Sequence, residues 1–344
     1  MSPDSGAVAA PVIDSGQRTG RPYVQYDVFT SEPLSGNQLA VFTDAAGLDT
    51  DTMQRLAREM NFPESTFILP VEWAGTDTRM RIFTPATEMP IAGHPTIGST
   101  FALADLGVIK AGTSRFVFHL NIGPTPVDLE WTAGRLSFAW MTQPNPVFGP
   151  IVENRAAAAL ALGLTVEDLW PDAPVQQVSC GVPFLYVPLR STAAVDRAAS
   201  DAAAFRHLGS AIGTDLPVFL FALAPSSAGD ARHDAGLEAD TDAGSAVSVY
   251  SRMFAPGFGI TEDPATGIAS GPLGAYLVSH RLVPVAAAAQ GGRHGTTVAI
   301  VSRQGVAMGR ASRIHISIGV ADGIIHDVKV GGRAVLVARG EFLV

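Results

Sequence analysis

The segments RIFTPATEMPIAGHPTIGS (residues 81–99) and SRMFAPGFGITEDPATGIASGPL (residues 251–273) share one pattern. Each has an arginine, an apolar residue, a phenylalanine, any residue and a proline, and then a glycine-containing turn and an apolar helix. The glycine of that turn, Gly93 or Gly267, lies eight residues after the proline in the first segment and eleven in the second. The pattern predicts a degenerate two-fold repeat with one copy in each of two domains. Coincidence between two strand–turn–helix units is the alternative.

The sequence around the repeat alternates irregularly between strand-like and helix-like patterns. Alternating apolar positions and β-branched or aromatic residues favour strands, whereas apolar residues three or four apart favour helices. Strands are expected at 23–30, 65–70, 78–85, 183–189, 217–223 and repeatedly over about 296–343. Helices are expected at 48–60, 95–107 and around 153–170.

Length and charge limit the classes of function. The 344 residues suggest about two domains. A net charge of -9 and a pI near 5.3 disfavour nucleic acid and anionic membranes as partners. No apolar run reaches the roughly 18 residues that a membrane span needs. The single cysteine, Cys180, excludes a disulfide within the chain and a cysteine-based zinc site, and it is expected to be a small buried residue beside a strand.

Two segments are expected to lie outside the packed domains. Residues 1–21 are rich in serine, glycine, proline and aspartate, so we expect a disordered extension. They lack the basic region and apolar core of a secretory signal, and with the single cysteine this favours a cytoplasmic protein. Residues 224–246 are small, polar and acidic, which is typical of a long mobile surface loop.

The two turns of the repeat are candidates for anion binding. The helix that begins near Pro95 presents free backbone N–H groups and the positive end of its dipole. Gly267 and Gly271 permit close backbone approach at the second helix. If both helix ends face one cleft between the domains, they form a carboxylate site that needs no lysine, arginine or metal.

Five segments together resemble the phenazine-biosynthesis (PhzF-like) isomerase family, in both order and spacing. The AGHPTIG and EDPATG motifs are the most specific parts of the resemblance, which covers about residues 23–344. The segments are FTSEPLSGNQLAVF (29–42), MNFPESTFILP (60–70), the two repeat segments quoted above and QGVAMGRASRIHI (304–316).

The resemblance implies an α+β fold similar to that of diaminopimelate epimerase. Two pseudo-symmetric domains, expected at 22–140 and 141–335, would each wrap a curved, barrel-like sheet around a central helix. The central helices would begin near residues 95 and 270, and the final strand of the chain could join the first domain. The family also implies a homodimer that uses no metal and no organic cofactor.

The family's site residues can be carried over by motif. Glu64 resembles its catalytic glutamate, which moves a proton between ring carbons of trans-2,3-dihydro-3-hydroxyanthranilate, first as base and then as acid. His94 and Asp263 would position this glutamate and the polar groups of the substrate. The backbone N–H groups of Gly93 and Gly267 would hold the substrate carboxylate. Three further motif residues are expected to contact the substrate: Pro95, Thr266 and Ile268.

One departure bears on the substrate. Ile268 stands where the family usually has serine, so a hydroxyl donor is lost and an apolar group enters. We therefore expect an isomerase that acts on a small carboxylate-bearing alkene or dihydroaromatic of secondary metabolism, such as antibiotic biosynthesis. The phenazine-pathway isomerase itself and a catalytically silent ligand-binding protein are the alternatives. A two-thiol racemase is excluded by residue type, and no motif of a nucleotide enzyme or of an HExxH zinc hydrolase is present.

Overall fold

The computed structural model describes residues 20–224, 247–285 and 295–344. Most of the expected extension 1–21 and of the expected loop 224–246 lies outside the described residues. Strand β1 (Gly20–Val28) begins before the expected domain start at residue 22. Gly20 and Arg21 pair there with the last strand of the chain, a contact that their local sequence does not signal.

The first half of the chain forms a strongly curved mixed sheet. Its pairing order is β18–β1–β2–β3–β4–β6–β7–β8, and the pairs β2–β3 and β4–β6 are parallel. Helix α1 connects the first parallel pair, and β5 and helix α2 connect the second, because parallel neighbours need a crossover. The bounds are β2 Asn37–Phe42, α1 Thr50–Met60, β3 Glu64–Leu69, β4 Thr78–Phe83, β5 Glu88–Met89, α2 Gly93–Asp105, β6 Arg115–Leu120, β7 Gly123–Thr132 and β8 Arg135–Gln143.

The second half repeats this plan. Strands β11–β12 and β13–β15 are its parallel pairs, and helix α7 lies between β14 and β15 as α2 does between β5 and β6. The bounds are β9 Val147–Ile151, α3 Arg155–Ala161, β10 Gln176–Ser179, β11 Pro183–Pro188, α4 Thr192–Arg197, α5 Ala202–Ile212, β12 Val218–Leu223, β13 Val247–Ala255, β14 Ile260–Asp263, α7 Gly267–Ser279, β15 Thr296–Gln304, β16 Ser312–Ala321, β17 Ile324–Gly332 and β18 Ala334–Leu343.

The two arginines of the sequence repeat occupy equivalent places. Arg81 on β4 makes a two-pronged ion pair with Glu88 on β5, and Arg252 on β13 makes the same pair with Glu262 on β14. Each guanidinium also lies over the phenylalanine two residues later, at 5.1 and 4.7 Å from the ring centre. The predicted two-fold repeat is therefore present in the structure.

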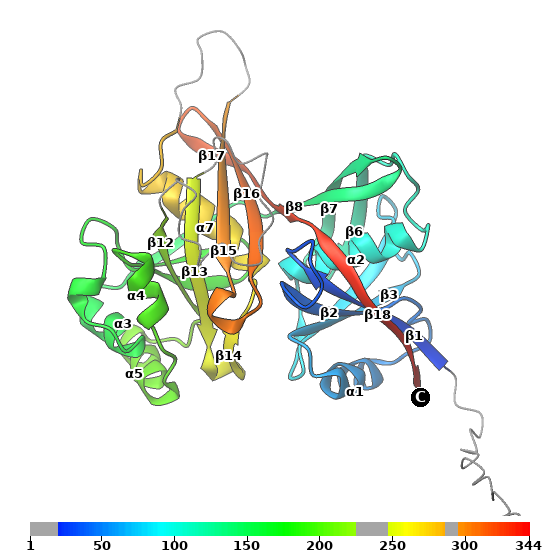
Figure 1. Cartoon of the computed structure of the whole chain (residues 1–344), viewed down its shortest axis with the longest axis horizontal. Coiled ribbons are helices and arrows are strands. Elements are labelled where there is room, and N and C mark those ends of the chain that lie inside the picture. The colour runs from blue at the N-terminus through cyan, green and yellow to red at the C-terminus, as the bar shows by residue number, and fades with distance from the viewer. Residues whose placement is uncertain (1–19, 225–246, 286–294) are drawn as a thin grey trace, which may run out of the picture.

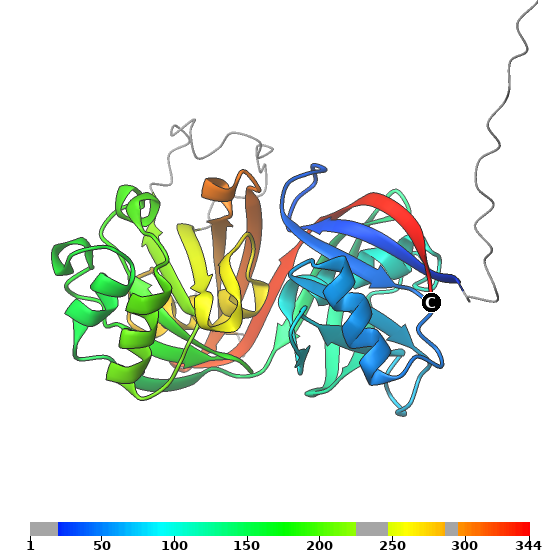
Figure 2. The same cartoon turned by 90° about the horizontal axis from the view of Figure 1, so that it is seen from below.

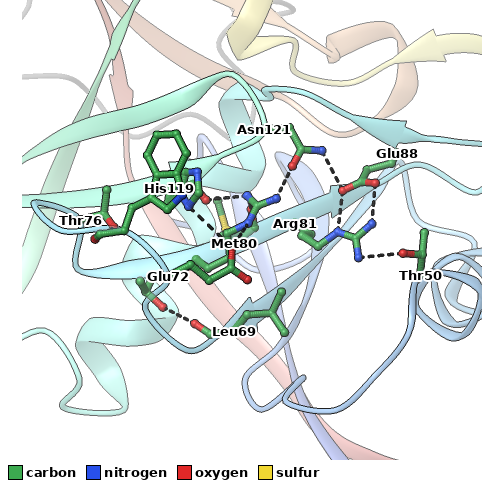
Figure 3. A network of polar contacts seen from close by, with 12 residues as sticks. Thr50, Leu69, Glu72, Thr76, Met80, Arg81, Glu88, His119 and Asn121 are labelled. Carbon is green, nitrogen blue, oxygen red and sulfur yellow. Dashed lines mark hydrogen bonds and ion pairs between the residues drawn. The ribbon is translucent and has the colours of Figure 1, made fainter.

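Figure 3 shows how the first ion pair is extended into a polar network. Arg81 also donates to the Thr50 hydroxyl at the start of α1, over 3.0 Å. Asn121, in the turn after β6, donates to Glu88 over 2.9 Å. The network ties β4, β5 and the β6–β7 turn together and so fixes the segment that leads into α2.

The halves exchange their last strands. After β8, the chain enters the second half, where β9 pairs with β10; after β17 it returns, and β18 pairs with β1. Strands β8 and β17 also pair with each other, which joins the two sheets. Figures 1 and 2 show the orange-red to red end of the chain, β17 followed by β18, crossing from the second half into the first, where β18 lies beside β1. The expected domain boundary near residue 140 stays a prediction.

The central helices are buried on all sides. Every residue of α2 from Gly93 to Leu103, and every residue of α7 from Gly267 to Val278, is buried. Such helices are apolar all round because they have no solvent face. They begin close to the expected positions 95 and 270. In the part of the chain that the structure describes, no helix is long and apolar enough to cross a membrane.

One expected helix is shorter than its alanine-rich sequence suggests. The predicted helix around 153–170 is α3 up to Ala161, followed by a separate turn of 3₁₀ helix at Val166–Asp168. Gly163 lies between them with φ of 65°, a left-handed conformation that ends a helix.

Candidate active site

Glu64 is the first residue of β3, and it lies beside the start of α2. The Glu64 side chain is 16% exposed, and its Oε2 lies 3.3 Å from Nδ1 of His94, the second residue of α2. Burial and the nearby charge of Asp263 raise the pKa of Glu64 from 4.5 to about 8. Near neutral pH this carboxyl therefore holds a proton in a large fraction of molecules and can still release it.

His94 is a neutral partner for this carboxyl. Its side chain is 4% exposed, and burial lowers its pKa to about 3, opposed by a weaker main-chain interaction with Gln38. Nε2 is buried and has no hydrogen-bond partner in the part of the chain that the structure describes. A neutral imidazole carries its hydrogen on one nitrogen only. With the hydrogen on Nδ1, His94 donates to ionised Glu64; with the hydrogen on Nε2, it accepts from protonated Glu64.

Asp263 comes from the other half of the molecule, at the end of β14. Its carboxylate accepts a hydrogen bond of 2.5 Å from the Thr266 hydroxyl and one of 2.9 Å from the Asn37 amide. Burial raises the pKa of Asp263 to about 6, the two hydrogen bonds oppose this rise, and the charge of Glu262 adds to it. Asp263 is thus ionised more readily than Glu64, and its charge favours the protonated form of Glu64.

The starts of α2 and α7 meet at two glycines. A Cβ placed on Gly93 would lie 2.5 Å from the backbone nitrogen of Ile268 and 2.6 Å from Gly267, closer than any real side-chain carbon. The N-cap residues, Ala92 and Thr266, make no side-chain hydrogen bond to their helices. Two helix N-termini with uncapped N–H groups therefore converge, as the sequence repeat predicts.

The other predicted contact residues lie at the same place. Pro95 is buried in the first turn of α2, and Thr266 directs its hydroxyl to Asp263. Ile268 is buried, at 7% exposure, and packs with the apolar core. The structure thus brings all of the predicted site residues to one junction between the halves, and their chemical roles stay a prediction.

Two further residues of the site were not singled out by sequence. Asn37, the first residue of β2, contacts both Asp263 and His94. Gln304, the last residue of β15, donates to the Asp263 carbonyl over 2.8 Å and to the Thr266 hydroxyl over 2.9 Å. Both lie in segments that carry the family resemblance. A single amide side chain, however, forms no sequence motif that would mark it as part of a site.

Neither the cysteine nor a metal-binding cluster of the described residues adds to the candidate active site. Cys180 is buried, as expected, and burial raises the pKa of its thiol to about 12. Within residues 20–224, 247–285 and 295–344, no group of three or more histidine, cysteine, aspartate or glutamate side chains is arranged to hold a metal ion.

Comparison with known proteins identifies the family. The sequence model of the PhzC-PhzF family, described as phenazine biosynthesis-like proteins, matches residues 26–340. Trans-2,3-dihydro-3-hydroxyanthranilate isomerase of Pseudomonas aeruginosa is 35% identical over 320 residues, which cover 93% of this chain and 98% of the relative. An uncharacterized isomerase of Mesorhizobium japonicum is 34% identical, with 94% and 99% covered.

Solved structures agree with the sequence comparison. A PhzF-family phenazine biosynthesis protein of Bacillus anthracis has a TM-score of 0.77 at 25% identity, with 95% of this chain and 100% of that chain covered. A predicted epimerase of P. aeruginosa has a TM-score of 0.71 at 31% identity, with 94% and 99% covered. A probable proline racemase of Agrobacterium radiobacter, at 11% identity with 93% and 92% covered, has a TM-score of 0.59 and shows the fold alone.

These likenesses confirm the expected α+β, epimerase-like fold. The chain is an isomerase that belongs to the PhzC-PhzF family of phenazine biosynthesis-like proteins.

Proposed function

We propose that Glu64 moves a proton between two carbon atoms of a small carboxylate-bearing alkene or dihydroaromatic, without a cofactor. The observation that carries this proposal is the carboxyl of Glu64 itself. It is partly exposed, its pKa is raised to about 8, and it lies 3.3 Å from a neutral histidine. A group that must first accept a proton and then return it works best when its pKa lies near the working pH.

The neighbours of Glu64 support both halves of this transfer. In the base step the Glu64 carboxylate takes a proton from carbon. Before this step, a hydrogen bond from the His94 Nδ1–H stabilises the ionised carboxylate. His94 does not compete for the transferred proton, because burial holds its pKa near 3. In the acid step Glu64 returns the proton to a second carbon of the same molecule. Asp263 supplies a fixed acceptor for a polar group of the substrate.

The converging helix ends support a carboxylate on the substrate. The N-cap residues of α2 and α7 offer no side-chain acceptor to the first N–H groups of these helices, and both helix dipoles favour negative charge there. Gly93 brings the two helix ends together, because a Cβ there would meet the backbone of Gly267 and Ile268; a Cβ on Gly267 would clash with the ring of Phe29 and lie 3.1 Å from the Cα of Gly93. A carboxylate bound at this point would be held by the backbone alone.

The P. aeruginosa relative is named for isomerising trans-2,3-dihydro-3-hydroxyanthranilate, so this compound is the first probe to use. Ile268 lacks the hydroxyl of the family's usual serine, and this difference favours a substrate with one polar group fewer. We therefore favour a substrate of secondary metabolism other than the phenazine precursor.

Label exchange tests the proposal. The purified protein would be incubated in D₂O with trans-2,3-dihydro-3-hydroxyanthranilate and, separately, with unsaturated amino acids, and deuterium at carbon would be followed by NMR. We expect label uptake by at least one probe with wild type and none with Glu64→Gln. Equal uptake by the variant would refute the role of Glu64. Saturable binding of the probes without any exchange would instead favour the catalytically silent alternative.

A second variant tests the argument about the substrate. Ile268→Ser restores the hydroxyl and should raise kcat/KM for trans-2,3-dihydro-3-hydroxyanthranilate relative to the other probes, by about tenfold if one hydrogen bond is gained. If the ratio of kcat/KM values between the probes is unchanged, Ile268 does not determine the choice of substrate.

A further inference from the structure

Asn37 links the two halves of the molecule at the candidate active site. It is fully buried on β2, in the first half, and its Nδ2 donates to Asp263 Oδ1 and to the Ala265 carbonyl in the second half, both over 2.9 Å. The same nitrogen lies 3.2 Å from His94 Nδ1. One amide group therefore touches two of the three predicted catalytic side chains.

The hydrogens of this amide are fully used. An NH₂ group has two hydrogens, and Asp263 and Ala265 take one each. No hydrogen remains for His94 Nδ1, which leaves that nitrogen free to pair with Glu64. Turning the amide over would point its oxygen at a carboxylate and a carbonyl, so this orientation is the only one that satisfies both contacts.

The loop before Asn37 is clamped to the second half. Arg310, near the start of β16, donates to buried Asp27 and to the carbonyls of Ser35 and Gly36 over 2.6–2.8 Å. The Ser35 hydroxyl donates to the Ala311 carbonyl over 2.7 Å. The position of Asn37 is thus fixed from both halves before the substrate arrives.

This amide is kept at a cost to stability. Its Oδ1 is buried and has no hydrogen-bond partner among the described residues, and an unpaired buried acceptor lowers stability. A group needed only for packing would not carry this penalty, and such groups collect at functional sites.

We propose that Asn37 is a positioning residue, which holds the Asp263 carboxylate in its ionised form and aimed at Glu64 and the substrate. The catalytic part of this inference rests on the proposed function, whereas the effect on Asp263 does not. Two carboxyl groups interact with Asp263: the charge of Glu262, on its own strand, raises the pKa of Asp263, and the charge of Asp263 raises the pKa of Glu64 on β3. Neutral His94 on α2 contacts the same Asn37 nitrogen as Asp263 does. Asn37 is the donor that reaches this carboxylate from the first half.

Two variants separate positioning from a purely structural role. Asn37→Leu removes both N–H donors at nearly constant volume. Ser35→Ala removes a buried contact between the halves in the same loop without touching Asp263, and Gly36 still donates to the Ala311 carbonyl over 3.1 Å. The pKa of Asp263 would be measured by carboxyl ¹³C NMR titration, with its signal assigned from Asp263→Asn.

We expect the pKa of Asp263 to rise from about 6 in wild type by about one further unit in Asn37→Leu and to stay unchanged in Ser35→Ala. With a probe that exchanges, kcat should fall by about 100-fold in Asn37→Leu with KM changed less, and the loss should be larger below about pH 7, where Asp263 of this variant becomes protonated. An unchanged pKa of Asp263 in Asn37→Leu, or equal shifts of this pKa in Asn37→Leu and Ser35→Ala, would overturn the proposal.

The proposal can also be tested on wild type, if Asn37→Leu does not fold. The side-chain ¹⁵N–¹H signals of Asn37 should shift with pH through the pKa of Asp263, and this titration should vanish in Asp263→Asn. Side-chain signals of Asn37 that do not change as Asp263 ionises would contradict the positioning role of Asn37. If wild type exchanges none of the probes, the proposed function fails, and the NMR titrations still decide the role of Asn37.

Discussion

Replacing Glu64 with glutamine should stabilise the folded protein at neutral and alkaline pH, although it abolishes proton transfer. Glutamine has the shape of a protonated glutamic acid and cannot ionise. The wild-type carboxyl is held where ionisation is unfavourable, since burial and the charge of Asp263 raise its pKa from 4.5 to about 8. The same strain that suits Glu64 to catalysis should therefore reduce the free energy of unfolding.

The sign and size follow from proton linkage. Between pH 4.5 and about 8 the folded state keeps a proton on Glu64 that the unfolded chain releases, so the stabilisation is complete below pH 4.5 and is lost as pH rises through about 8. The slope is at most about 1.4 kcal/mol per pH unit, or about 4 kcal/mol between pH 5 and pH 8. Because the side chain is 16% exposed, solvent reduces this ceiling, and we expect about 1–3 kcal/mol.

Urea unfolding at pH 5 and pH 8 measures the effect. The difference in unfolding free energy, Glu64→Gln minus wild type, should grow by about 1–3 kcal/mol from the lower to the higher pH. Glu59→Gln, which alters an exposed carboxylate on α1, is the matched control and should give the same difference at both pH values. A Glu64→Gln protein that is no more stable than wild type at pH 8, or a difference independent of pH, would refute the reasoning.

Three other measurements test the site and the junction. For any probe that turns over, kcat/KM should rise with pH and level off above about 8, because the base step needs ionised Glu64; a flat profile from pH 6 to 9 would contradict this. Gly93→Ala should destabilise the protein by about 1–3 kcal/mol in urea unfolding, whereas Gly257→Ala, where a Cβ meets no atom within 4 Å, should change it by less than about 0.5 kcal/mol. Asp27→Asn removes the buried carboxylate that pairs with half-buried Arg310 and should cost about 3 kcal/mol, whereas Arg115→Gln, in an exposed ion pair, should cost under about 1 kcal/mol; equal losses would argue against the clamp between the halves.

The motifs located much of the site because its parts are local along the chain. The segments around His94 and Asp263 each combine a turn and the start of a helix within a few residues, and the arginine repeat marks their equivalence. Helix α1 is equally local, since Asp49 caps it by accepting a hydrogen bond from the backbone N–H of Thr52. Such features depend on spacing and residue type, which a sequence displays directly.

Tertiary structure alone decided how these parts meet. Asn37 and Asp263 are 226 residues apart, and no spacing rule connects them; the pairing of β8 with β17 and the exchange of β9 and β18 between the halves bring β2 against the start of α7. The same holds for the pKa of Glu64, because desolvation is a property of everything that packs around a carboxyl. The sequence by itself determined the repeat, the helix starts and the residue types of the site. The pairing of the halves determined which side chains touch and how readily each one gives up its proton.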